Sequence, residues 1–294
     1  MSELISAIIA GIAQGMPLFI VASGLTLIFG VLRVLNFAHG AFFMLGAFLL
    51  ATMLSGGADN LAVFLLAALA AAAVLAVVGV AADTAVFKRL YGQDHMITLL
   101  ASYALLLGLE GLTTMLWGNK PRSQAPVDGL GGSLSVGRVE VASYDVFLLV
   151  VGLAIGAGLY LLLQRTRYGK VIRAVSTDEL MARALGIRAR RVQAGVFALG
   201  AALAGLSGAL MAPLLSVDVG LAPTYAIQSF AIVIIGGLGS VGGALTAALI
   251  LGIADSLMVS YVPDVAGFSL YIAVALILLL RPQGLAGRPV GSAA

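Results

Sequence analysis

Polar side chains are scarce in this sequence, so the polar residues that interrupt its apolar stretches are the first candidates for function. Within residues 32–41, an arginine, an asparagine and a histidine separate two apolar runs. A plain tight loop at a membrane surface would explain this pattern, and so would an unwound segment at membrane depth. Non-helical backbone is tolerated at depth where it is buried in protein or lines a cavity, and transporters place binding sites there. On the second interpretation, Asn36, His39 and Gly40 are candidate residues of a translocation pathway.

A carboxylate within an apolar segment is the second candidate. Glu110 lies inside such a segment, and a charged group in the middle of a membrane is costly enough to mark a functional site by default. It is expected to pair with a polar neighbour or to face a cavity, unless it lies at the membrane interface. Asp83, Asp218 and Asp255 fall near the ends of apolar segments, where contact with water explains them.

A short helix is predicted within the strongly basic stretch 165–191. Ser176 and Glu179 fit a capping box, in which the serine caps the helix and the glutamate returns to the backbone. Glu179 and Arg183 are four residues apart in the favourable order, and Gly186 ends the helix. The candidate residues of this helix are Ser176, Thr177, Asp178, Glu179, Arg183 and Gly186. Its small apolar face could rest on anionic lipid or dock into a groove on a partner protein.

A glycine-rich break divides the longest uncharged run, which covers residues 219–254. A single helix of 36 residues would be about 54 Å long, too long for one membrane crossing. The candidate hinge consists of Gly236, Gly237, Gly239 and Gly242. Residues 237–242 also fit G-x-G-x-x-G, but a dinucleotide site needs a preceding strand and a later acidic residue. A hinge between two spans is therefore the better interpretation.

Several kinds of chemistry have no matching motif. No G-x-x-x-x-G-K-[ST] sequence is present, so no P-loop is expected, and no G-x-S-x-G sequence supports a serine hydrolase. The chain has two histidines and no cysteine, which excludes an H-E-x-x-H metal site and thiolate ligands. We therefore expect neither a catalytic residue nor a metal site, and no cofactor bound by this chain.

Composition assigns these candidates to a membrane protein. The chain has 294 residues, of which 61% are hydrophobic and 10% are charged, whereas soluble domains carry roughly 25% charged residues. Nine segments are long and apolar enough to be candidate spans: 5–31, 36–55, 61–82, 95–117, 146–164, 192–214, 220–237, 240–260 and 265–280. We predict an all-α polytopic membrane helix bundle, a single domain over 1–294 with about 8–10 transmembrane helices and broken or re-entrant segments. Pro17 could divide the first segment into two pieces.

The basic residues predict the orientation. Eight of the sixteen Lys and Arg residues lie within residues 165–191, which makes this stretch a cytoplasmic loop. Alternating spans then place residues 118–144 outside and the C-terminus in the cytoplasm. Membrane topology accounts for the basic patch, so a nucleic-acid role is not expected. The acidic Glu3 and the long uncharged run behind it argue against a cleaved signal peptide.

Four stretches resemble one known family, the permease subunits of branched-chain amino acid ABC importers. They are residues 24–40 (GLTLIFGVLRVLNFAHG), 197–205 (FALGAALAG), 236–240 (GGLGS) and 281–285 (RPQGL), in the family's order. The resemblance extends over residues 5–287. The importer loop motif E-A-A…G is matched by position more than by letters, because Leu180 and Met181 follow Glu179.

The resemblance implies a permease that is no enzyme itself and lies in the bacterial inner membrane. Its expected partners are a second, homologous permease subunit, two cytoplasmic ATPases that bind ATP-Mg, and an external substrate-binding protein. The helix within 176–186 would be the coupling helix that contacts an ATPase. Substrates in the family include branched-chain and other amino acids, amides, urea and aromatic acids. The alternative is an ion-coupled secondary transporter that depends on Glu110 or Asp255.

Overall fold

Nine apolar helices form the fold in the computed structural model, which describes residues 2–55, 57–58, 60–136, 139–281 and 284–286. They are α1 (Ser2–Leu32), α2 (Ala38–Met53), α3 (Leu61–Ala85), α4 (His95–Trp117), α5 (Ser143–Arg165), α8 (Ala189–Met211), α9 (Leu221–Gly236), α10 (Val241–Tyr261) and α11 (Ser269–Leu280). Each corresponds to one segment expected from the sequence. Arg138, Pro282, Gln283 and the last eight residues, for which we expect a cytoplasmic C-terminus, lie outside the described part.

The helix lengths confirm an all-α polytopic bundle with short segments. Within the described residues, α1, α3, α4, α5, α8 and α10 are long and apolar enough to cross a membrane. The apolar helices α2, α9 and α11 are shorter. The 16 residues of α2 and of α9 extend about 24 Å each, less than the hydrocarbon thickness of about 30 Å.

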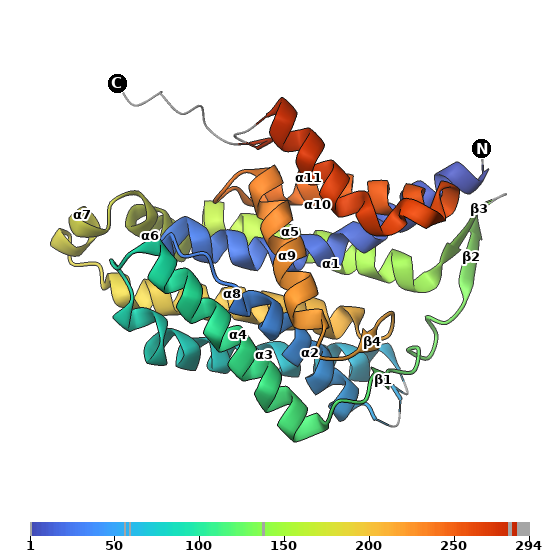
Figure 1. The fold of residues 1–294 in the computed structure, drawn as a ribbon, viewed down its shortest axis with the longest axis horizontal. Helices are drawn as coiled ribbons and strands as arrows, with labels where there is room; N and C mark the ends of the chain where they lie inside the picture. Colours follow the sequence, from blue (N-terminus) through green and yellow to red (C-terminus); the bar gives the residue numbers. More distant parts are fainter. Residues whose placement is uncertain (1, 56, 59, 137–138, 282–283, 287–294) are drawn as a thin grey trace.

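The remaining elements lie at two opposite ends of the bundle (Figure 1). At one end are the 3-10 turn η1 (Phe87–Arg89) and the short helices α6 (Arg167–Thr177) and α7 (Glu179–Ala184). At the other end, β2 (Ser133–Val136) pairs antiparallel with β3 (Val139–Ala142), and β1 (Arg122–Ser123) with β4 (Ser216–Val217). The 3-10 helix η2 (Pro263–Phe268) leads into α11.

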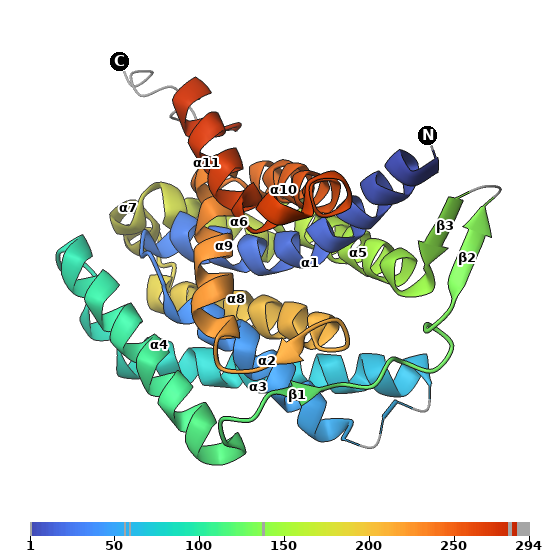
Figure 2. The same cartoon turned by 45° about the vertical axis from the view of Figure 1, so that its right-hand side comes forward.

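Helix α8 forms the centre of the bundle, between α1 on one side and α2 and α3 on the other (Figure 2). Small residues allow this close packing. A Cβ atom at Gly46 of α2 would collide with the carbonyl oxygen of Gly205 of α8. A Cβ at Gly205 itself would lie 2.8 Å from the Leu75 side chain of α3. Because van der Waals contact is a main attraction between helices in lipid, such small residues stabilise the bundle.

Helix α1 is one continuous helix, so Pro17 does not divide it. The proline removes one backbone donor from the helix interior. At the same level the Ser207 hydroxyl of α8 donates a hydrogen bond to the Pro17 carbonyl, at 2.7 Å. The two-piece alternative for the first segment is therefore wrong. Along its length α1 packs against α10, where the Ser256 hydroxyl donates to the Ala7 carbonyl at 2.7 Å.

Basic residues are concentrated at the end of the bundle that carries α6 and α7. Twelve of the sixteen lie there: Arg33, Lys88, Arg89, Arg165, Arg167, Lys170, Arg173, Arg183, Arg188, Arg190, Arg191 and Arg281. The end of α11 belongs to this end because the Leu285 amide donates to Ile235 at the end of α9. The opposite end carries Lys120 and Arg122 among the described residues. The two ends of the bundle therefore differ in positive charge, and this difference is the observation from which an orientation in the membrane can be inferred.

Candidate functional site

The chain folds back into the bundle between α1 and α2. Helix α1 ends at Leu32, and residues 33–37, here called the joint, are not helical. The joint packs against α4: the Phe37 amide donates to the Ser102 hydroxyl at 3.1 Å, and this hydroxyl lies 3.3 Å from the Leu35 carbonyl. Ser102 lies seven residues into α4, about 10 Å along its axis. Residues 34–37 of the joint are therefore unwound and pack against other helices, whereas Arg33 is exposed.

The first turn of α2 lies beside the middle of α1. His39 Nε2 lies 2.8 Å from the Val21 carbonyl oxygen, and Val21 precedes the end of α1 by eleven residues, or about 17 Å. The unwound stretch is shorter than the sequence suggested, because α2 already begins at Ala38 and includes His39 and Gly40. Gly40 allows α2 to cross α9, since a Cβ there would collide with the Ala222 carbonyl oxygen.

Two polar side chains of this region have unused hydrogen-bonding groups. Asn36 and His39 are completely buried. Neither the oxygen nor the nitrogen of the Asn36 amide has a partner in the protein, and the same holds for His39 Nδ1. A buried polar group without a partner costs about 1–3 kcal/mol. The joint and the first turn of α2 therefore hold hydrogen-bonding groups that the rest of the described protein does not satisfy.

Glu110 is not brought together with Asn36 and His39 through a hydrogen bond or a shared cavity. It lies eight residues beyond Ser102 on α4, partly exposed. Among the described residues its carboxylate has no hydrogen bond, while its main-chain carbonyl accepts one from Thr114. Asp255 does have a partner, because the Ser269 hydroxyl donates to it.

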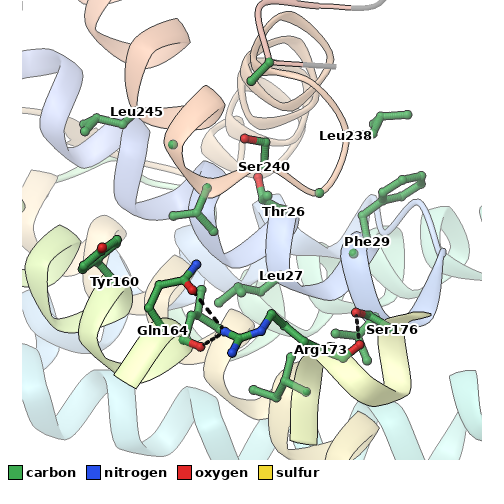
Figure 3. A pocket seen from close by; sticks show the side chains of 18 of the residues that line it. Thr26, Leu27, Phe29, Tyr160, Gln164, Arg173, Ser176, Leu238, Ser240 and Leu245 are labelled. Carbon is green, nitrogen blue, oxygen red and sulfur yellow. Dashed lines mark hydrogen bonds between the residues drawn. The ribbon is translucent and has the colours of Figure 1, made fainter. Parts of the chain in front are cut away.

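A large cavity opens beside α1 at the end of the bundle that carries α6 and α7 (Figure 3). Its volume is about 1100 Å³, and α1, α5, α6 and the turn between α9 and α10 form its walls. The polar side chains on these walls are Thr26, Arg33, His95, Tyr160, Gln164, Arg173, Ser176, Thr177 and Ser240, and none of the described lining residues carries a carboxylate. The cavity therefore combines apolar walls with hydroxyl groups and cationic side chains.

Arg173 connects two walls of this cavity. Its guanidinium donates from α6 to the Leu163 carbonyl of α5 and to Gln164 Oε1, the latter at 3.3 Å. Figure 3 shows the Arg173 guanidinium beside Gln164, with its hydrogen bonds as dashed lines. Sequence reasoning treated Arg173 only as one of many basic residues and did not single out Tyr160 or Gln164. The spacing of these two polar residues, four apart on α5, was the available signal.

The glycine break is a tight turn at the mouth of the same cavity. Helix α9 ends at Gly236, α10 begins at Val241, and Ser240 caps α10 by accepting from the Gly243 amide at 3.0 Å. Gly237 and Gly239 have φ values of 96° and 83°, which favour glycine. Gly236 permits close contact with α10, whereas Gly242 lies in α10 with open space beside it. The two helices are thus divided where the sequence predicted.

The short helix in the basic stretch forms, but with a different cap. Asp178 caps α7 by accepting from the Met181 amide at 2.9 Å. The Ser176 and Thr177 hydroxyls instead donate to the Arg173 carbonyl and complete α6. The predicted capping box is therefore wrong. Its physical reason is that α6 continues through Thr177 and leaves Asp178 as the first residue in extended backbone.

The other predicted features of this helix are present. Arg183 donates to Glu179 in an ion pair. Gly186 has a φ of 84°, and its amide bonds to the Arg183 carbonyl at 2.9 Å, which ends α7. Leu180 and Leu185 are 79% and 74% exposed. Helix α7 therefore presents an apolar face with no partner within the described chain.

Comparison with known proteins identifies the relatives of this arrangement. The model of the family "Branched-chain amino acid transport system / permease component" matches residues 7–280. The high-affinity branched-chain amino acid transport permease protein BraD of Pseudomonas aeruginosa is 29% identical over 295 residues, covering 96% of this chain and 95% of BraD. LivH of Escherichia coli, which has the same description, is 28% identical and covers 95% of this chain and 94% of LivH.

A second type of permease matches part of the chain. LivM of Escherichia coli is 34% identical over 147 residues, which are 48% of this chain and 33% of LivM. No solved structure matches the chain significantly. Because the family model covers nearly all of the helices described above, this chain belongs to the permease components of branched-chain amino acid transport systems.

Proposed function

We propose that this protein imports branched-chain amino acids, or a related small polar or organic-acid solute, as the membrane permease subunit of an ABC transporter. The single observation that carries this proposal is the family match over residues 7–280, with relatives such as BraD and LivH aligned along nearly their whole length. The chain performs no covalent chemistry in this proposal. ATP-Mg belongs to partner ATPases.

The proposed complex contains a second permease subunit, two cytoplasmic ATPases and an external substrate-binding protein. The partial match to LivM alongside the full-length match to LivH supports a pair of homologous permeases. The substrate-binding protein would meet the end that carries β2 and β3, within residues 118–144. This end is the external one in the proposed orientation.

The orientation places α6, α7 and the whole loop 165–191 in the cytoplasm. Among the described residues, twelve basic side chains at that end against two at the other support it, because Lys and Arg accumulate in cytoplasmic loops. The C-terminus then lies in the cytoplasm, since α11 ends beside the turn between α9 and α10. In this bacterial inner-membrane arrangement, α1 begins outside.

Helix α7 is proposed as the coupling helix. Its ends are fixed by Asp178 and Gly186, and its exposed Leu180 and Leu185 offer an apolar face to a groove on an ATPase. Arg173 would transmit a movement of α7 from α6 to α5, because its guanidinium on α6 donates a hydrogen bond to the Leu163 carbonyl near the end of α5. The movement would thus reach the wall of the large cavity.

The translocation pathway is proposed to include the joint and the large cavity. Asn36 and His39 are buried in this conformation, and Gly40 holds α2 against α9, so the route would be closed at the joint. The unused groups of Asn36 and His39 would meet a polar solute in another conformation. The cavity would be its cytoplasmic exit, with Gly236, Gly237, Gly239 and Gly242 as hinge. Glu110 remains a second candidate on α4.

Uptake of radiolabelled leucine, with a panel of related solutes in parallel, tests this function. The permease pair, the ATPases and the binding protein are reconstituted into liposomes whose lumen contains ATP. We expect accumulation that needs both ATP and the binding protein and is unaffected by a protonophore. Accumulation without ATPases that collapses with the proton gradient would instead support an ion-coupled transporter. Failure of every solute in the panel would overturn the substrate assignment.

A further inference from the structure

A second, smaller pocket lies beside α7 at the same end of the bundle. Its volume is about 330 Å³, and it lies between the end of α1, the segment that leads into α4, the corner between α6 and α7, and α8. Arg33, Asp178, Glu179 and Gln193 are its main polar side chains, and Leu180 and Val175 lie among its apolar ones. Arg33 also lines the larger cavity, but the acidic residues line only this pocket.

Gln193 leaves a hydrogen-bond acceptor unused in this pocket. The residue is 3% exposed, and its Oε1 has no partner within the described protein. The Tyr91 hydroxyl on the pocket wall does not serve as this donor, because it donates to Asp83. Burial, together with that carboxylate, raises the pKa of Tyr91 above its usual range, so the hydroxyl stays a neutral donor to Asp83. Gln193 therefore lacks a donor, which a ligand can supply.

Positive and negative groups face the same space. Arg33 forms no ion pair among the described residues. The ion pair found there joins Arg183 to Glu179. Its backbone is left-handed, with a φ of 54°, a conformation that non-glycine residues rarely adopt and that clusters at ligand-binding and switch regions. Asp178 uses Oδ1 to cap α7 and has a second carboxylate oxygen. The pocket thus offers a cation for a carboxylate and acceptors for an ammonium group.

We propose that this pocket binds an aliphatic α-amino acid from the cytoplasm. Arg33 binds the α-carboxylate, Gln193 Oε1 and Asp178 accept from the ammonium group, and Val175 contacts the aliphatic side chain. This inference rests on the proposed function, from which it takes the orientation and the solute class. The bound amino acid links α1 and α8 to the coupling helix. It therefore slows the movement of α7, so that the imported solute inhibits its own transport.

The test uses proteoliposomes that contain the complete transporter and have ATP in their lumen. One sample has no leucine in the lumen, and the other has a saturating concentration. With the binding protein and leucine outside, luminal leucine should lower the rate of ATP hydrolysis at least about fivefold, the lower range of allosteric coupling. The complex in nanodiscs, without the binding protein, should bind radiolabelled leucine. No inhibition and no binding would overturn the proposal. Because leucine-free vesicles report uptake separately, that result would leave the proposed function standing.

Three variants locate the effect, each compared with its own rate in leucine-free vesicles. Gln193→Leu removes the unused acceptor, and Arg33→Asn removes the guanidinium while keeping a residue that tolerates a left-handed backbone. Both should lose inhibition and leucine binding. Gln228→Leu is the matched control, because Gln228 Oε1 on α9 also lacks a partner but lies outside the pocket. Inhibition that survives in Gln193→Leu and Arg33→Asn, or that disappears in Gln228→Leu, would contradict the site.

Discussion

The joint between α1 and α2 and the corner between α6 and α7 are held by opposite kinds of contact. Long-range contacts hold the joint and the first turn of α2: Phe37 bonds to Ser102, His39 to Val21, and Gly40 packs on Ala222. The caps and the ion pair that shape the corner join neighbours in sequence. Thr166 caps α6 at Gly169, Asp178 caps α7 at Met181, and Arg183 pairs with Glu179.

This difference matters for transport. A segment held by local bonds keeps its shape when it moves as a unit, which suits a helix that a partner pulls. A segment held by distant helices changes its contacts whenever those helices move, and the unused groups of Asn36 and His39 lie in this second kind of segment. The joint is therefore where a movement of the bundle would change the exposure of polar groups.

The largest expected effect is that of Gly40→Val at the joint. The new side chain would collide with the Ala222 carbonyl and approach the Ala226 backbone, and backbone atoms cannot move aside as a flexible side chain can. Overpacking costs about 1–3 kcal/mol where neighbours can adjust, and more here. We expect loss of most monodisperse protein in size-exclusion chromatography. Gly108→Ala on α4 is the control, because nothing lies within 4 Å of its added carbon; equal yields for both variants would contradict this packing.

The second effect separates stability from transport at the same region. Asn36→Leu removes two buried polar atoms that lack partners, so the variant should be more stable by about 1–3 kcal/mol. Leucine uptake should fall at least tenfold, because the group proposed to meet the solute is gone. Thermal unfolding in detergent and uptake in proteoliposomes measure the two quantities.

Asn60→Leu provides the contrasting control for Asn36. Asn60 caps α3 by accepting from the Val63 amide at 3.0 Å. Its loss should lower stability by about 1 kcal/mol while uptake per folded molecule is kept. If Asn36→Leu also unfolds earlier and transports normally, Asn36 is a structural residue and the pathway lies elsewhere.

The third effect concerns the corner. Leu180→Ser with Leu185→Ser removes apolar side chains that contribute little to folding, because they are 79% and 74% exposed. The folded permease should be recovered in normal yield, but it should copurify at least tenfold less ATPase, as expected when central apolar contacts of an interface are lost. Leu134→Ser, 49% exposed on β2 at the opposite end, should change neither quantity. Retained ATPase in the double variant would argue that α7 rests on lipid.

The sequence predicts the helices well, because continuous runs of about twenty apolar residues and the glycines that interrupt them are local signals. The turn at Gly237 and the stop at Gly186 are two examples. It predicts poorly which polar residues meet. No local sequence pattern shows that Ser102 hydrogen-bonds to the joint, that Glu110 lies apart from it, or that Arg173 hydrogen-bonds to the end of α5. These contacts depend on how distant helices cross, which hydropathy does not encode.

The smallest expected effect distinguishes the two possible caps of α7. Asp178→Ala removes the acceptor of the Met181 amide and should destabilise α7 by about 1 kcal/mol, whereas Ser176→Ala leaves α7 unchanged. Hydrogen exchange of the amides of residues 180–184 measures this directly, and about 1 kcal/mol corresponds to roughly fivefold faster exchange. Asp178→Ser should restore protection, since serine also caps helices well. Faster exchange in Ser176→Ala instead would mean that the capping box of residues 176–179 forms and that α6 ends earlier, which would make the corner one longer, less rigid segment.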